Sequence, residues 1–237
     1  MMDKHMDTSA LVKGWFEEAV TSTAYTAWRA EAKAAWDFYD GTQWTKEEVD
    51  ALAEHGQPAI VINRIAAKID NLAGTEVAGR TRVVYRSRSG AKGEEDTARV
   101  LTDLALYVAE RNDQALEVSA MFKAGLVGGI GWLDVGVEER DEGMSVFNRC
   151  EDEFAVVWDP AARRADMSDA RFVARERWLD EDELGRLFPD KAGKVREALQ
   201  EGVRAAPYAR AFGGFGREVA YRDEAKGMYR VVEVQYR

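Results

Sequence analysis

The sequence is poor in the residues from which most catalytic and metal sites are built. Cys150 is the single cysteine, which excludes an intrachain disulfide and a thiolate metal cluster. The two histidines, His5 and His55, lack the helical spacing of a zinc-binding pair. No histidine lies near Cys150 in the sequence, so a buried cysteine in a strand is the better interpretation than a nucleophile. These shortages predict a protein that is not an enzyme, with no catalytic residues, no metal and no cofactor.

Long apolar runs and positive charge are also scarce. No apolar run approaches the ~20 residues that span a bilayer, and Met1–Ser9 lacks the apolar centre of a signal peptide. We therefore expect synthesis in the cytoplasm. The chain has 33 Lys and Arg against 43 Asp and Glu, a formal net charge of -10 at pH 7. Tight DNA binding usually needs a basic surface, because affinity comes from neutralising phosphates. The charge argues against a protein that grips DNA by its whole surface, although it does not exclude DNA as a partner, and solubility alone is the favoured explanation of the acidic balance.

The first half of the chain has the apolar spacing of helices. One long helix is predicted over residues 9–39, because five side chains recur every three or four residues: Tyr25, Trp28, Ala32, Trp36 and Tyr39. Shorter helices are expected to begin at the capping box Thr45–Glu48 and at Asn63, a favourable N-cap. Two more are expected over about 94–111 and 113–127. Between them, residues 80–88 alternate like a strand whose one face carries four arginines: Arg80, Arg82, Arg86 and Arg88.

The second half reads mostly as strands. Strands are predicted over 130–138, 145–150, 153–158 and 171–178, and a hairpin over 218–223 and 228–236. A helical pair from Asp180 to about residue 201 and a glycine-containing loop over 202–217 interrupt them. The fold class is therefore α+β, helices first and mainly antiparallel strands later, with a possible division into residues 1–128 and 129–237. Because the alternation still runs at Arg237, we expect the sequence to be incomplete.

Three carboxylates form the best candidate for chemistry. Asp159, Asp166 and Asp169 fall on one predicted loop and could hold Mg²⁺, as a metal-dependent phosphodiesterase or nuclease requires. The spacing does not match a calcium loop. Asp-Pro is a common turn start, and Ser168-Asp169 can bond their own backbone, so the structural interpretation is favoured. The glycine-rich runs 125–131 and 213–216 lack the lysine of a phosphate-binding loop and are read as turns.

The arginine face has three open interpretations. It could bind nucleic acid, it could be a solvated strand face, or it could form ion pairs with an acidic neighbour. The last two are favoured. Trp36 and Tyr39 are expected to be buried aromatic residues of a core or an interface.

Several segments resemble, in order, the portal proteins of short-tailed (podovirus-type) tailed phages. Each segment alone is a weak signal, and their shared order is more specific. The resemblance spans residues 15–237 and is carried by these stretches: Trp36–Trp44, Gly56–Arg64, Asn71–Gly74, Lys123–Trp132, Trp158–Pro160 with Asp166–Arg171, and Trp178 before Phe188-Pro189.

The resemblance implies a structural subunit of a ring, usually of twelve copies, at one vertex of the capsid in the virion. Genomic double-stranded DNA would pass through this ring during packaging and ejection, without sequence-specific binding. The implied partners are the terminase large subunit, which hydrolyses the ATP, the major capsid and scaffolding proteins, and tail adaptor proteins. Family members are longer, so residues 1–237 would be a wing-like region without most of the stem, clip and crown. Another ring-forming head-tail adaptor remains an alternative.

In a ring, the acidic surface of a neighbouring subunit would be the natural partner of the arginine face. The candidate interface residues are therefore Arg80, Arg82, Arg86, Arg88, Trp36 and Tyr39.

Overall fold

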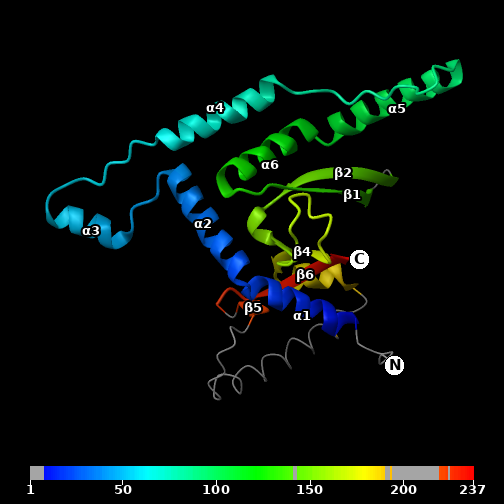
Figure 1. Ribbon diagram of the computed structural model, residues 1–237. Helices are drawn as coiled ribbons and strands as arrows, with labels where there is room; N and C mark the ends of the chain where they lie inside the picture. Colours follow the sequence, from blue (N-terminus) through cyan, green and yellow to red (C-terminus); the bar gives the residue numbers. More distant parts are fainter. Residues whose placement is uncertain (1–7, 141–142, 190–192, 194–218, 224) are drawn as a thin grey trace. The chain divides into compact units, whose positions relative to one another are not determined.

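The computed structural model describes residues 8–140, 143–189, 193, 219–223 and 225–237 (Figure 1). The chain divides into two compact units. Unit 1 comprises Met1–Ala27 and Ala155–Arg237, and unit 2 comprises Trp28–Phe154. Unit 1 is thus built from the two ends of the sequence, and unit 2 from its middle.

The predicted long helix over residues 9–39 is interrupted. It consists of α1 (Thr8–Thr21) and α2 (Thr23–Asp40), with Ser22 between them. The Ser22 hydroxyl donates to the Ala19 carbonyl at 2.8 Å and accepts from the Tyr25 N–H at 3.2 Å. Such bonds from a serine side chain to nearby backbone compete with a continuous helical ladder. The prediction of one helix is therefore wrong at this residue. Its end is confirmed, since Gly41 follows α2 with a positive φ of 75°.

Unit 1 packs α1 against an antiparallel sheet of four strands. The strands β3 (Val156–Trp158), β4 (Phe172–Leu179), β6 (Met228–Tyr236) and β5 (Arg222–Asp223) lie side by side in that order. The short helix α7 (Glu181–Leu187) follows β4 and begins at the predicted Asp180–Glu183 capping box. The apolar core of this unit is formed by these buried side chains: Phe16, Ala19, Tyr25, Val156, Val157, Ala170, Phe172, Ala174 and Leu184.

Unit 2 is mainly helical. It contains most of α2, then α3 (Lys46–Glu54), α4 (Arg64–Ala78), α5 (Lys92–Arg111) and α6 (Gln114–Gly128). A hairpin of β1 (Trp132–Arg140) and β2 (Gly143–Glu151) closes the unit, and both α4 and this hairpin pack against α6. The predicted caps are confirmed. Thr45 and Glu48 form a capping box at α3, and the Asn63 side chain accepts from the Ala66 N–H at α4.

Two predicted strands differ from the structure. Residues 80–88 form no strand; they run as an irregular segment between α4 and α5 (Figure 1), because no described strand pairs with them. The backbone N–H of Tyr85 instead donates to the Thr102 hydroxyl of α5 at 3.0 Å. Residues 153–158 form a 3₁₀ turn, Glu153–Ala155, and only then the short β3. The strand prediction is therefore wrong over 80–88 and too long at Glu153.

The α+β class is confirmed, with helices followed by antiparallel strands in two sheets. The strand predictions over 130–138, 145–150 and 171–178 correspond to β1, β2 and β4, and the C-terminal hairpin to β5 and β6. The compact units cut the chain elsewhere than after residue 128. Most of the predicted helical pair up to residue 201, and the loop over 202–217, lie outside the described residues.

Burial is unequal between the two units. Among the described residues of unit 2, the fully buried ones are small or polar: Ala32, Ala98, Ala124, Gly128, Asn148 and Glu153. Large apolar side chains of this unit are open to solvent, with Ile60 67%, Ile62 78% and Val83 65% exposed. An isolated soluble domain normally covers such side chains. Unit 2 therefore has apolar surface that the described part of the chain does not cover.

The tight junction between α6 and β1 yields a stability prediction. A Cβ added to Gly131 would lie 2.2 Å from the Met121 carbonyl oxygen, which is backbone and cannot give way. We expect Gly131→Ala to lower the free energy of unfolding by about 1–3 kcal/mol. Gly74→Ala in α4, where no atom lies within 4 Å, should instead stabilise by about 0.5–1 kcal/mol. Urea denaturation of both variants measures the difference, and equal stabilities would contradict the described α6–β1 junction.

Candidate interface

The four predicted arginines fall into two groups. Arg80 is held by its own chain: its guanidinium lies 3.3 Å from Glu76, and it donates to the Ala115 carbonyl at 2.8 Å and the Ser119 hydroxyl. Ser119 also donates to Glu76. This bond, and to a smaller extent the bond from Arg80, holds the pKa of Glu76 below its usual value. Arg80 therefore serves the packing of α4 against α6.

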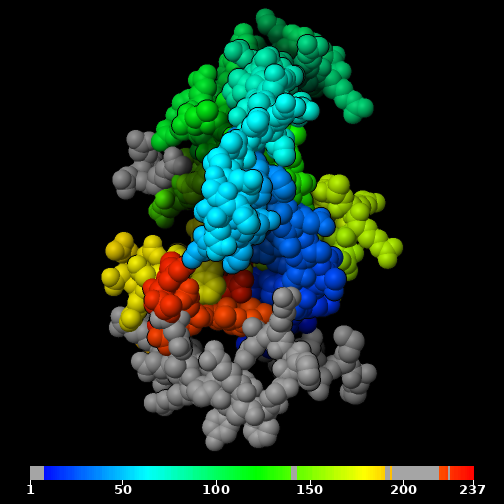
Figure 2. Space-filling model, turned by 90° about the vertical axis from the view of Figure 1, so that its left-hand side faces the viewer, coloured from blue at the N-terminus to red at the C-terminus, as the bar shows by residue number. Residues whose placement is uncertain are grey.

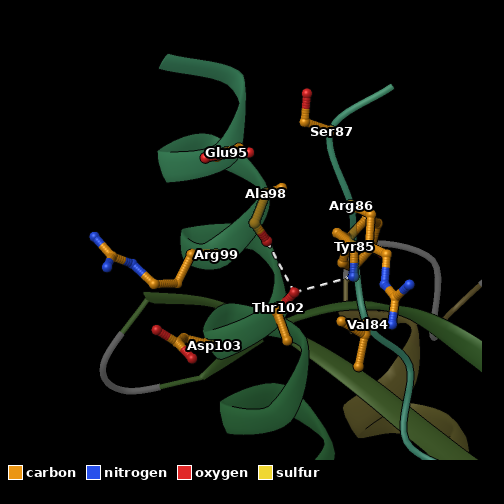
Figure 3. A pocket seen from close by; sticks show the side chains of 9 residues that line it. All are labelled: Val84, Tyr85, Arg86, Ser87, Glu95, Ala98, Arg99, Thr102 and Asp103. Carbon is orange, nitrogen blue, oxygen red and sulfur yellow. Dashed lines mark hydrogen bonds between the residues drawn. The ribbon is translucent and has the colours of Figure 1, made fainter. Parts of the chain in front are cut away.

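The other three arginines are available to a partner. Arg82, Arg86 and Arg88 are exposed, and within the described part of the chain they make no hydrogen bond or ion pair. Arg86 extends to the side of the segment turned away from α5 (Figure 3). The predicted arginine face therefore exists as an open row of three cations on an irregular segment, rather than as four on a strand.

A shallow pocket lies between this segment and α5 (Figure 3). Its volume is about 460 Å³, and its lining mixes both charges with apolar side chains: Val84, Tyr85, Arg86, Ser87, Glu95, Ala98, Arg99, Thr102 and Asp103. The Glu94 carboxylate fixes the next turn by accepting from the Ser89 and Ser87 hydroxyls, and these two bonds, the one from Ser89 above all, lower the pKa of Glu94. The pocket is open to solvent.

Trp36 and Tyr39 are half-buried rather than buried, and both contact their own unit. The Trp36 indole N–H donates to the Glu153 carboxylate. The Tyr39 hydroxyl donates to Asp70 at 2.7 Å, which lowers the pKa of Asp70. Lys123 lies over the Tyr39 ring, 4.5 Å from its centroid, and 3.3 Å from Asp70. The expectation of full burial is wrong for a single chain, since each ring keeps an open side. Their role at an interface stays a prediction.

Sequence reasoning missed the most buried polar group of unit 2. Glu153 is 5% exposed and lies against the end of α6, where a Cβ on Gly128 would come within 2.9 Å of its Oε1. The Trp28 indole donates to the Gly128 carbonyl at 2.9 Å beside it. Two indoles of α2 thus bind polar groups where α6 ends. The sequence carried no signal for this, because Glu153 sits in a turn without apolar periodicity.

The three loop aspartates do not form a metal site. Asp159 is 1% exposed and accepts from the Arg171 side chain at 2.7 and 2.8 Å and from two backbone N–H groups. The Arg171 guanidinium holds the pKa of Asp159 far below its usual value. Asp169 accepts from the backbone of Arg163 and Arg164, and Asp166 from that of Ser168. Within the described ranges, no three His, Cys, Asp or Glu side chains could hold a metal ion. The structure does not support the metal-dependent alternative.

The remaining reactive candidates are also unsuited to catalysis. Cys150 lies half-buried in β2, and burial together with the nearby Glu117 raises the pKa of its thiol. A raised pKa disfavours the thiolate that would be the nucleophile. His55 ends α3 as its cap residue, as predicted for a histidine at a helix end. His5 lies outside the described residues.

The described residues thus offer exposed apolar and cationic side chains for contact, and the loop carboxylates are committed to structural bonds. A comparison with protein families identifies the class of protein. The family model described as Phage P22-like portal protein matches residues 13–237, so the chain belongs to this family of phage portal proteins. No curated protein matches the chain.

Membership gives the chain a structural role in the phage portal and a place in the virion. The family is structural and is not known for enzymatic activity. Portal proteins self-associate and contact capsid, terminase and tail components in general. The described helices include none that is both long enough and apolar enough to cross a membrane. The resemblance inferred from the ordered segments is thereby confirmed, and the family replaces the adaptor alternative.

The contact between Trp36 and Glu153 can be tested by two substitutions. Trp36→Phe keeps most of the ring but leaves the buried Glu153 without this donor, which should cost about 1–3 kcal/mol of unfolding free energy. Trp36→Ala also removes packing and should cost about 3–5 kcal/mol. Trp44→Ala, at a 40% exposed tryptophan, is the control and should cost about 1 kcal/mol or less. If Trp36→Phe were neutral in thermal unfolding, the indole would not support Glu153.

The paired Asp159 predicts a defined dependence of stability on pH. Because its pKa is lowered in the folded protein, its contribution is complete above the unfolded value of 3.8 and is lost as pH falls through the lower folded value. Asp159→Asn should therefore destabilise the protein at neutral pH, and the difference from wild type should shrink below about pH 4. Unfolding at pH 7, 4 and 3 measures this. Asp40→Asn, at the exposed end of α2, is the control that loses one carboxylate without touching this ion pair. A deficit of Asp159→Asn that stays constant with pH would contradict the ion pair.

Proposed function

We propose that this chain forms the wing-like region of a portal ring subunit, with about twelve copies at one capsid vertex. Genomic DNA passes through that ring when it is packaged and again when it is ejected. The observation that carries the proposal is the family match over residues 13–237, almost the whole sequence.

The surface of unit 2 supports self-association. Its large apolar side chains are exposed or half-buried, while its fully buried residues are small or polar. Burying apolar surface against a neighbouring copy contributes about 25 cal/mol per Å², the same driving force that builds a core. A ring supplies such a neighbour to every subunit, because each copy contacts the next one through the same pair of surfaces.

The charge of the chain supports passage of DNA rather than tight binding. A formal net charge of -10 repels phosphates on average, so double-stranded DNA can slide without sequence-specific contacts. The further partners in this role are the terminase large subunit, the major capsid and scaffolding proteins, and tail adaptor proteins. Assembly would begin in the cytoplasm of the host bacterium and end in the virion.

Native mass spectrometry of the full-length protein tests the proposal, with negative-stain electron microscopy of the same sample. We expect a closed ring of about twelve copies with a central opening. The ring should persist on dilution to micromolar concentration, because a portal must remain assembled while DNA is driven through it. A full-length protein that stays monomeric when concentrated would overturn the proposal.

A further inference from the structure

Two oppositely charged surfaces of unit 2 lack a partner within the described chain. One is the arginine row, Arg82, Arg86 and Arg88, on the segment between α4 and α5. The other is a face of α3, which has no buried residue. Figure 1 shows that the two are separated along unit 2, and Figure 2 shows the light blue to cyan residues of α3 and α4 at the surface. The structure therefore presents two complementary charged patches that do not meet each other.

The acidic face of α3 is continuous. Glu47, Asp50 and Glu54 stand at positions i, i+3 and i+7, which places them on one side of the helix. All three are exposed and make no hydrogen bond or ion pair with other described residues. Glu48 lies on another side and is used in the capping box with Thr45. At ~1.5 Å of rise per residue, the three carboxylates spread over roughly 10 Å of helix.

The arginine row is longer than the acidic face. A fully extended chain advances ~3.3 Å per residue, so Arg82 and Arg88 stand at most roughly 20 Å apart. Arginine side chains are long and present a planar fork that binds carboxylates in a bidentate manner. Their guanidinium groups can therefore converge on carboxylates that lie closer together than the arginine backbones do.

We infer that α3 of one subunit docks on the arginine row of the next subunit, so that Glu47, Asp50 and Glu54 pair with Arg82, Arg86 and Arg88. The occupant is a second copy of this chain, because charge complementarity is supplied by the chain itself. Two different surfaces meeting head to tail form a heterologous contact, which closes into a ring when the rotation permits. The inference rests on the proposed ring and assigns one of its contacts.

The contact also explains why these charges are left open. Arg80, at the start of the same segment, is hydrogen-bonded to Glu76 and Ser119, whereas the three arginines after it make no such bond to other described residues. Exposed pairs are worth little while both groups stay in water, but opposed like charges at an interface cost several kcal/mol. The two patches thus set which surfaces meet, while the apolar surface of unit 2 provides the driving force.

Charge reversal tests the contact in the full-length protein. The acid-reversed variant carries E47K, D50K and E54K, and the arginine-reversed variant carries R82E, R86E and R88E. Each alone should place like charges opposite each other and weaken ring formation at least about 100-fold. The combined variant with all six changes should form rings again. An equimolar mixture of the two three-residue variants should also form rings, because their subunits can alternate.

Matched controls separate this contact from net charge. The variant E31K/E110K/E139K changes the net charge by the same amount as the acid-reversed variant, and K33E/R64E/K68E changes it by the same amount as the arginine-reversed variant. All six of these residues are exposed residues of unit 2 that lie outside the two patches. Both controls should assemble as wild type. Native mass spectrometry at 50 and 300 mM NaCl provides the readout, and circular dichroism checks folding. The neutral variant E47Q/D50N/E54Q should weaken assembly less than reversal does.

The outcomes separate the contact from the ring itself. The contact is overturned if either three-residue reversal forms rings with wild-type affinity. It is also overturned if neither the mixture nor the combined variant forms rings. In both cases the ring proposal stands. Arginine-reversed protein that assembles normally but loses binding of a short DNA duplex, measured by fluorescence anisotropy, assigns the row to nucleic acid and also overturns it. Failure of the wild type itself to assemble overturns the ring, and this contact with it.

Discussion

The shortage of buried apolar surface in unit 2 is the constraint on which the rest of the structure depends. Unit 1 buries Phe16, Val157 and Phe172 almost completely, so its sheet and α1 share an ordinary core. Unit 2 has no equivalent among its described residues; its helices touch through half-buried side chains. Because folded proteins are only marginally stable, a unit with so little core depends strongly on directional polar bonds.

Those polar bonds link elements far apart in the sequence. Trp28 and Trp36 reach from α2 to the end of α6 and to Glu153, and Arg80 reaches from the end of α4 to Ser119. A buried polar group that loses its partner costs more than an apolar contact of the same size, so such bonds fix the relative placement of helices. In unit 1 the ion pair of Asp159 with Arg171 links the end of β3 to the start of β4, and that of Glu176 with Arg230 links β4 to β6, beside an apolar core.

Local signals in the sequence were sufficient for elements that their own residues determine. The caps at Thr45, Asn63 and Asp180, the hairpin strands and the α+β class follow from short-range chemistry. Features that depend on distant partners were not accessible. Residues 80–88 alternate like a strand but find no strand to pair with. The buried Glu153 depends on a hydrogen bond from the indole of Trp36, 117 positions earlier in the sequence. At the candidate interface, which stays a prediction, the alternating pattern pointed to four arginines, but nothing in it separated Arg80 from the other three.

Unit 1 is discontinuous, and this has a consequence for the order of events during synthesis. Helix α1 leaves the ribosome before residues 28–154, yet the residues that cover its aromatic face come after them: Trp15 stacks on Phe172 and meets Tyr236 edge-on. At usual translation rates of ~5–20 residues per second, the aromatic face of α1 stays exposed to solvent for on the order of ten seconds, until the covering strands have been synthesised. Nascent chains on one polysome therefore expose the apolar face of α1 before the sheet that covers it has been made. This makes the protein a natural client of cotranslational chaperones.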